Sequence, residues 1–319
     1  MLIFIFKTLW QVKLLFNMEK VFSAIPTPFL DDKIDFQSLE NVIEYNIKNG
    51  VEGLVFAGST GEWSSLSQDE WKQLIDFGVK TTQTMNKKYD KNAVAITGCG
   101  FNYTKLAVEY AKLSEELGVN YILATTPSYN KPQQEGIYQH FSEICNAVKT
   151  KIILYNVPSR TGTDMKNDTI IKLAKDFNQI VGLKDASGDL KRVVDLYDKL
   201  HYINRQDDFK LLSGDDETQI GFNAMGGSGV VSVVANIAPK LICEIQDDCK
   251  NNNYSSALAK QPMLYELSKA MFCETNPVPV KYALQQLGIF KSAEVRKPLI
   301  ELGDESKVYI QNTISTYLK

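Results

Sequence analysis

One lysine in this sequence stands where it could act as a nucleophile. Lys184 ends the apolar run at 180–183, which predicts a buried strand that carries the lysine inward rather than into solvent. Only a neutral amine attacks a carbonyl carbon, and burial disfavours the charged ammonium form. The pattern therefore favours a lysine that forms a Schiff base with a carbonyl substrate. A lysine that extends into solvent, or that pairs with Asp185, is the alternative that the sequence leaves open.

Polar side chains end the neighbouring predicted strands. The turn GSTG offers the hydroxyls of Ser59 and Thr60, together with backbone N–H groups at an expected helix N-terminus, and could bind a carboxylate. Tyr155 and Tyr129 are phenols that could pass protons, and Arg160 presents a planar fork suited to a second carboxylate. Each has an ordinary alternative: a helix cap, packing, or a surface charge. Together they indicate carbonyl chemistry on a substrate that bears a carboxylate.

The elements that position these residues recur about every 30 residues. Short apolar, β-branched runs predict eight strands, and amphipathic stretches at 35–48, 68–82, 103–117 and 134–149 predict intervening helices. The strands are expected at 21–25, 53–57, 93–97, 121–125, 152–155, 180–184, 209–212 and 230–234. Eight strand–helix units in order indicate an α/β fold, a (β/α)8 TIM barrel, in which reacting groups gather at the carboxyl ends of the strands. A doubly wound sheet has the same local pattern.

The two ends of the chain differ from the barrel pattern. Residues 1–17 are predicted to be an N-terminal extension, with Met18 as the alternative start; a surface-seeking helix is the other interpretation. Residues 18–250 are assigned to the barrel, and 251–319 to a C-terminal helical region that continues to the end of the chain. A polar turn is expected at 247–254. A break is expected at 276–279, because the two prolines there cannot lie inside a helix.

Composition excludes several classes of protein. The 319 residues include 35 Lys and Arg against 38 Asp and Glu, which gives no basic surface for nucleic acid. Five scattered cysteines favour a reducing cytoplasm, and Cys99 is expected to be a buried thiol rather than a nucleophile. Two histidines, His140 and His201, stand in no ligand cluster, so neither a metal site nor a metal-dependent aldolase is expected. The GGSG run at 226–229 precedes its strand and is interpreted as a tight turn.

Six segments in order carry a resemblance to a known family. They are GSTGE at 58–62, TPSYNKPQQEG at 126–136, YNVPSRTG at 155–162, GLKDASG at 182–188, LLSGDD at 211–216 and NPVPVKYA at 276–283. From about Met18 to its end, the chain resembles the pyruvate-dependent Schiff-base aldolases, a family that includes the dihydrodipicolinate synthases and the N-acetylneuraminate lyases.

The resemblance implies roles for the residues already singled out. Lys184 is expected to form an imine with pyruvate, with no cofactor, and Tyr155 to handle the protons. Ser59 and Tyr129 complete a proton relay, with Tyr129 supplied by a neighbouring subunit. The protein is therefore expected to be at least a homodimer, and a homotetramer is expected because members of the family are often dimers of dimers. Pyruvate, aspartate semialdehyde and further copies of the chain are the expected partners, with no nucleic acid and no membrane.

Substrate binding in the resemblance falls to four further residues. Thr60 and its neighbouring amides would hold the carboxylate of pyruvate, while the Val231 carbonyl and the turn at Gly214 line the floor. Arg160 at the mouth would bind the carboxylate of L-aspartate 4-semialdehyde, and a buried guanidinium there discriminates strongly against a partner that lacks this group. This arginine favours 4-hydroxy-tetrahydrodipicolinate synthesis over sialic-acid cleavage, although Ser59 is more typical of the lyase. A catalytically silent barrel that serves as a binding subunit is the remaining alternative.

The resemblance also bears on regulation. Many members are inhibited by lysine at the dimer interface, where they place a carboxylate for the inhibitor's ammonium; here Leu106 stands at that position. Other matching positions also depart, except for the retained Asn102; they are Trp63, Gln68, Trp71 and Ser128. Because an ammonium buried without a counter-charge is costly, little or no lysine inhibition is expected.

Overall fold

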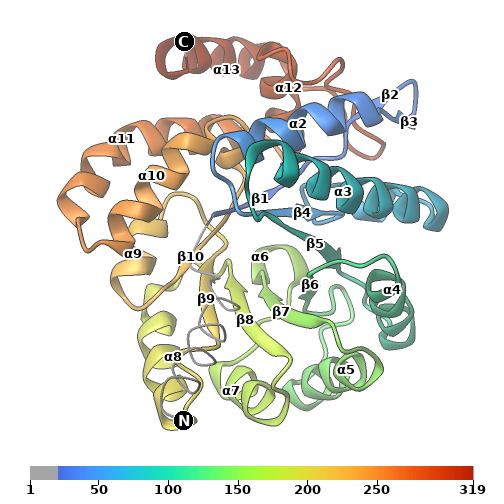
Figure 1. Ribbon diagram of the computed structural model, residues 1–319, viewed down its shortest axis with the longest axis vertical. Coiled ribbons are helices and arrows are strands. Elements are labelled where there is room, and N and C mark those ends of the chain that lie inside the picture. Colours follow the sequence, from blue (N-terminus) through green and yellow to red (C-terminus); the bar gives the residue numbers. More distant parts are fainter. Residues whose placement is uncertain (1–20, 319) are drawn as a thin grey trace, which may run out of the picture.

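Eight parallel strands close into a barrel. The computed structural model describes residues 21–318, so the expectations for residues 1–17 lie outside the described part of the chain. The strands are β1 (Val21–Ala24), β4 (Gly53–Phe56), β5 (Val94–Cys99), β6 (Tyr121–Thr125), β7 (Lys151–Asn156), β8 (Ile180–Asp185), β9 (Lys210–Ser213) and β10 (Gly229–Ser232). They pair in chain order, and β10 returns to β1 (Figure 1). The predicted TIM barrel is confirmed, and the open doubly wound sheet is excluded.

Helices cover the outside of the barrel and continue beyond it. They are α2 (Phe36–Lys48), α3 (Gln68–Tyr89), α4 (Thr104–Glu116), α5 (Gln134–Ala147), α6 (Pro158–Thr161), α7 (Asn167–Asp176), α8 (Leu190–Tyr202), α9 (Gln219–Ala224), α10 (Pro239–Lys250), α11 (Tyr254–Met271), α12 (Val278–Gln286) and α13 (Asp304–Tyr317). Two short 3-10 helices, η1 (Trp63–Ser65) and η2 (Val234–Asn236), follow β4 and β10. None of the helices in residues 21–318 is long and apolar enough to cross a membrane.

Local sequence explains where the helices begin and end. Asp35 caps α2 by accepting hydrogen bonds from Gln37 N and Ser38 N, and Ser67 with Glu70 forms a capping box on α3. Gly118 follows α4 with a φ of 76°, a left-handed conformation that glycine adopts without steric cost. The predicted bounds of α2, α3, α4 and α5 are correct to within two residues, except that α3 runs seven residues beyond its predicted end.

The structure departs from the sequence-based expectations in three segments. Residues 247–250, expected in a turn, complete α10, and only 251–253 separate it from α11. Residues 287–303 are irregular, whereas the chain was expected to be helical to its end. A small antiparallel hairpin of β2 (Phe29–Leu30) and β3 (Lys33–Ile34) was not foreseen, since its strands have only two residues each. The break expected at 276–279 is confirmed only as far as Pro277; Pro279 lies in the first turn of α12, where the missing N–H has no helical partner to lose.

The C-terminal helices form a group at one side of the barrel. α11 packs on α10, and α12 and α13 lie beyond α2 in Figure 1. The irregular segment between α12 and α13 returns toward the hairpin, because Glu294 accepts hydrogen bonds from Asp31 N and Asp32 N. The C-terminal group therefore contacts the N-terminal end of the described chain. The division of the chain at residue 250 stays a prediction.

Candidate active site

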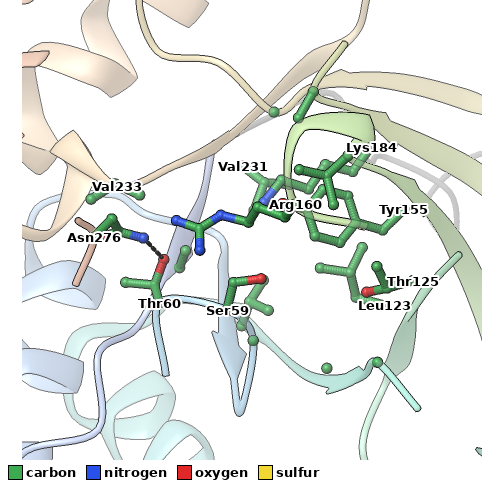
Figure 2. Close-up of a pocket in the computed structure, with 18 of the residues that line it drawn as sticks. Ser59, Thr60, Leu123, Thr125, Tyr155, Arg160, Lys184, Val231, Val233 and Asn276 are labelled. Atoms are coloured by element: carbon green, nitrogen blue, oxygen red, sulfur yellow. Dashed lines mark hydrogen bonds between the residues drawn. The ribbon is translucent and has the colours of Figure 1, made fainter. Parts of the chain in front are cut away.

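Strand alternation directs Lys184 into the barrel. In β8, Lys184 lies level with Tyr155 of β7 and Leu212 of β9, and successive side chains on a strand point to opposite faces. Lys184 is 7% exposed, and its Nζ lies 4.2 Å from the centre of the Tyr155 ring. Figure 2 shows the two side chains next to each other in the cavity. The amine and the phenol are therefore buried neighbours inside the barrel.

Asp185, the next residue, points the other way and has its own partners. Its carboxylate accepts hydrogen bonds from Ser187 Oγ at 2.6 Å and Asn156 Nδ2 at 3.2 Å, and Arg192 Nε lies 3.9 Å away. Burial raises the pKa of this carboxyl group. No carboxylate in residues 21–318 lies within ion-pair distance of Lys184 Nζ. The two alternatives left open for Lys184, a solvent-exposed lysine and a pair with Asp185, are both wrong.

A cavity of about 320 Å³ opens at the carboxyl ends of the strands and contains most of the predicted site residues. Seven of the eight line it: Ser59, Thr60, Tyr155, Arg160, Lys184, Gly214 and Val231. Figure 2 shows six of them by name, converging from the turn after β4, from strand β7 and the helix α6 that follows it, and from strands β8 and β10. The topology therefore brings together residues that are up to 172 positions apart in the chain, from Ser59 to Val231.

The turn after β4 offers free hydrogen-bond donors to this cavity. Gly61 N donates to Gly58 O and Glu62 N to Ser59 O, whereas Ser59 N and Thr60 N have no acceptor in residues 21–318. Thr60 is buried, and its hydroxyl lines the cavity (Figure 2). Successive free N–H groups in a turn bind anions, so this turn fits a carboxylate.

The expected helix terminus does not contribute to this turn. η1 and a short connection follow it, and α3 begins only at Gln68, where Ser67 caps its N-terminus. The prediction that the turn leads directly into a positive helix end was therefore wrong. The donors belong to the turn itself.

Arg160 lies at the mouth of the cavity. It belongs to α6, which follows β7 without a loop, and Figure 2 shows its guanidinium extending over the cavity toward Thr60. The residue is exposed in the single chain, so the expectation of a buried guanidinium is wrong here. A planar fork at the mouth remains suited to a carboxylate of an incoming ligand.

Tyr129 is the predicted site residue that the single chain does not bring to the cavity. It is 89% exposed, has a φ of 71°, and its N–H donates to Thr161 O at 3.3 Å. No hydrogen bond in the described chain links Ser59 to Tyr155 either. The proton relay expected from the resemblance is thus incomplete within one chain.

Several lining residues were not singled out from the sequence. The most informative is Asn276, whose Nδ2 donates to Thr60 Oγ1 at 2.9 Å (Figure 2). The polar segment after β9 and helix α11 add Asp215, Glu217 and Ser268 to the lining. Asn276 lies in one of the six matching segments, but no local pattern in the sequence pairs it with a turn 216 residues away.

Other candidate groups of the sequence are not suited to take part in a reaction at this cavity. Cys99 lines it, but burial raises the pKa of this thiol to about 12, which leaves no thiolate near neutral pH. No group of three or more His, Cys, Asp or Glu in residues 21–318 is arranged to hold a metal ion. The GGSG run lies at the opposite end of the barrel, where it leads into β10. The site thus consists of a buried amine beside a phenol, a turn with N–H groups at Ser59 and Thr60 that are unpaired in the described chain, and a guanidinium at the mouth.

Comparison with known proteins gives consistent matches along nearly the whole chain. The Dihydrodipicolinate synthetase family matches residues 17–317. A 4-hydroxy-tetrahydrodipicolinate synthase of Rickettsia bellii is 44% identical, and the match covers 92% of this chain and 95% of that protein. A chloride-inhibited dihydrodipicolinate synthase from Acinetobacter baumannii, solved in complex with pyruvate, is 38% identical with a TM-score of 0.85 and coverages of 92% and 97%. A monomeric dihydrodipicolinate synthase variant is 34% identical with a TM-score of 0.87 and coverages of 92% and 95%.

Proposed function

The chain belongs to the dihydrodipicolinate synthetase family, and we propose that it condenses pyruvate with L-aspartate 4-semialdehyde to 4-hydroxy-tetrahydrodipicolinate through an imine on Lys184. This reaction is a step of diaminopimelate and lysine biosynthesis. The observation that carries the assignment of Lys184 is its buried amine, which has no carboxylate partner in residues 21–318 and lies against the Tyr155 ring in a cavity with an anion-binding turn.

The first half of the reaction activates pyruvate. Lys184 Nζ attacks the keto carbon, and loss of water from the carbinolamine gives the imine. Removal of a methyl proton then gives an enamine, with Tyr155 as the group placed to move the protons. The hydroxyl of Thr60 and the N–H groups of Ser59 and Thr60 hold the carboxylate throughout, with Gly214 and Val231 on the cavity floor.

The second half joins the aldehyde. The enamine carbon attacks the aldehyde carbon of the semialdehyde, and the alkoxide that forms takes up a proton. The substrate's own amine then attacks the imine carbon and displaces Lys184, which closes the ring and regenerates the free lysine. Arg160 at the mouth binds the carboxylate of the semialdehyde, because its fork is the cation placed over the cavity (Figure 2). No cofactor is required for any of these steps.

The position of Tyr129 supports a site completed by a second copy. This side chain is exposed and does not line its own cavity, so it is free to enter the cavity of a neighbouring chain and to extend the proton relay of Tyr155 and Ser59. We therefore propose a homodimer at least, and a homotetramer as a pair of such dimers. Five free cysteines fit a reducing cytoplasm.

We propose further that lysine does not inhibit this enzyme. Leu106 is half-buried against the hydrophobic core and supplies no charge, and Gln68 donates to Glu109 at 2.9 Å. Trp63 packs edge-on against Phe101 in a chain of aromatic contacts that continues through Tyr110 to Trp71. Aromatic rings therefore fill the region in which the resemblance places an inhibitor.

Borohydride trapping tests the proposed function directly. Pyruvate and sodium borohydride should reduce the imine to a stable adduct, and peptide mapping should locate that adduct at Lys184. Lys184→Arg keeps a cation at the position and serves as the matched control, which should gain no adduct. An unmodified wild type would leave a silent barrel as the better description. Comparison of aspartate semialdehyde with N-acetylmannosamine as the second substrate then tests the choice of aldehyde, which a preference for the sugar would overturn.

A further inference from the structure

The turn that carries Ser59 and Thr60 is held by residues from the C-terminal segment. Asn276, which precedes α12, is 6% exposed and donates its Nδ2 proton to Thr60 Oγ1 (Figure 2). At the other end of the turn, Glu62 forms an ion pair with Lys281 of α12. Two contacts from residues 276–281, at the start of α12 and just before it, therefore bracket a turn near the start of the barrel.

The Glu62–Lys281 pair is buried on all sides. The side chain of Lys281 is fully buried, and that of Glu62 is 4% exposed. Lys281 Nζ also donates to Glu294 O at 2.8 Å and lies 4.2 Å from the centre of the Phe29 ring. Arg296 N donates to the second carboxylate oxygen of Glu62 at 3.1 Å. Because Glu62 has a left-handed φ of 51°, these contacts fix a backbone conformation that a non-glycine residue rarely adopts.

The hydrogen bond from Asn276 orients the Thr60 hydroxyl group. A hydroxyl has one proton to donate and two lone pairs to accept with. Asn276 Nδ2 uses one lone pair, so the Thr60 proton cannot point toward this amide group. Within the cavity the hydroxyl is then a donor, which is the role that a bound carboxylate requires.

We propose that Asn276 and Lys281 are positioning residues for the carboxylate of pyruvate. Asn276 acts through the Thr60 hydroxyl, and Lys281 acts through Glu62 on the backbone that presents Ser59 N and Thr60 N. The inference rests on the proposed function, since it takes pyruvate as the ligand of the turn. It makes the C-terminal segment part of the binding machinery, and it predicts a selective effect on pyruvate with little effect on the aldehyde.

The test is a double-mutant cycle on pyruvate binding. Asn276→Ala should raise the pyruvate concentration for half-maximal borohydride trapping by roughly five- to tenfold, which is the loss of affinity expected when about one hydrogen bond is removed. Because Asn276 acts through Thr60, adding Asn276→Ala to Thr60→Val should cause no further increase. Asn276→Asp should be more harmful than Asn276→Ala, since a carboxylate takes the Thr60 proton and repels the ligand. The KM for aspartate semialdehyde should stay within about twofold of the wild-type value in all variants that retain turnover.

Lys281 is tested together with its partner so that no lone charge remains buried. The double variant Lys281→Met/Glu62→Gln should also raise the half-saturating pyruvate concentration while leaving the KM for the aldehyde unchanged. Gln311→Ala is the matched control, because Gln311 donates to Tyr282 of α12 and touches neither the turn nor the cavity. This control should bind pyruvate as the wild type does.

The outcomes separate the two proposals. A wild type that traps pyruvate, with Asn276→Ala and Thr60→Val strictly additive, would overturn the positioning role alone. Equal increases in the half-saturating pyruvate concentration and in the KM for aspartate semialdehyde would also overturn it, since they indicate a general structural defect. A wild type that traps no pyruvate would overturn the proposed function and this inference with it.

Discussion

Replacing Lys281 with methionine should destabilise the protein through the charge left behind. Methionine fills much of the same volume, but Glu62 would keep a 4% exposed carboxylate whose remaining contact is the hydrogen bond from Arg296 N. Breaking a buried ion pair by removing one partner costs about 3–5 kcal/mol. We therefore expect Lys281→Met to lower the free energy of unfolding by about this amount.

The measurement is urea unfolding followed by circular dichroism, at equal subunit concentrations for all variants. Lys80→Met is the matched control: Lys80 pairs with Asp76 four residues away, and their side chains are 72% and 45% exposed. It should cost no more than about 0.5 kcal/mol. The double variant Lys281→Met/Glu62→Gln should recover most of the loss, because glutamine still accepts from Arg296 N without a charge.

The differences in unfolding free energy between these variants separate an unpaired charge from a packing defect. If Lys281→Met costs no more than Lys80→Met, the buried carboxylate is not penalised and the argument fails. It fails equally if the double variant is as unstable as Lys281→Met, because the loss then comes from packing around α12 and not from an unpaired charge.

Three further predictions concern acid stability, the reacting lysine and regulation. Burial lowers the pKa of His140 from 6.5 to about 4, so between these pH values the unfolded chain binds more protons than the folded chain, and the folded state loses stability as the pH falls. Relative to His140→Gln, the wild type should lose about 3 kcal/mol of unfolding free energy in urea between pH 6.5 and 4; if the unfolding free energies of the two proteins change in parallel with pH, the assignment to His140 is refuted. In Gly214→Ala, the new methyl group would lie 2.7 Å from Ala186 Cβ and 3.1 Å from Lys184 Cε and would displace the reacting lysine. The rate of imine trapping should therefore fall by about ten- to hundredfold, whereas an unchanged rate would show that Lys184 has room to move. Lysine at millimolar concentration should leave steady-state turnover unchanged, whereas half-inhibition in the submillimolar range would contradict the proposed absence of feedback.

The sequence predicted the barrel because parallel strands leave a strong signal. Strands buried on both faces are uninterrupted apolar runs, and Lys184 is conspicuous as a charged residue at the end of such a run. Barrel topology then places strand ends together, so seven predicted residues line one cavity although they are far apart in the chain. Their convergence could therefore be predicted from the order of the strands and helices alone, without knowledge of the side-chain packing.

What the sequence could not predict depends on tertiary contacts. The hydrogen bond from Asn276 to Thr60 and the pairing of Lys281 with Glu62 join segments more than 200 residues apart, and neither has a local pattern. The irregular segment at 287–303 was mistaken for helix because its contacts with the β2–β3 hairpin, such as those of Glu294, replace the hydrogen bonds that a helix would form. The exposure of Arg160 depends on what covers the mouth of the cavity, which periodicity does not report.

The contact between Asn276 and Thr60 also has a consequence for synthesis on the ribosome. A nascent chain grows at about 5–20 residues per second, so the 216 residues between these two positions take roughly 10–40 s to translate. During that interval strand β4 and its turn exist without the amide group that orients the Thr60 hydroxyl. A polypeptide released prematurely before residue 276 would therefore lack this contact even with all eight strands present, and it would bind pyruvate more weakly than the complete chain.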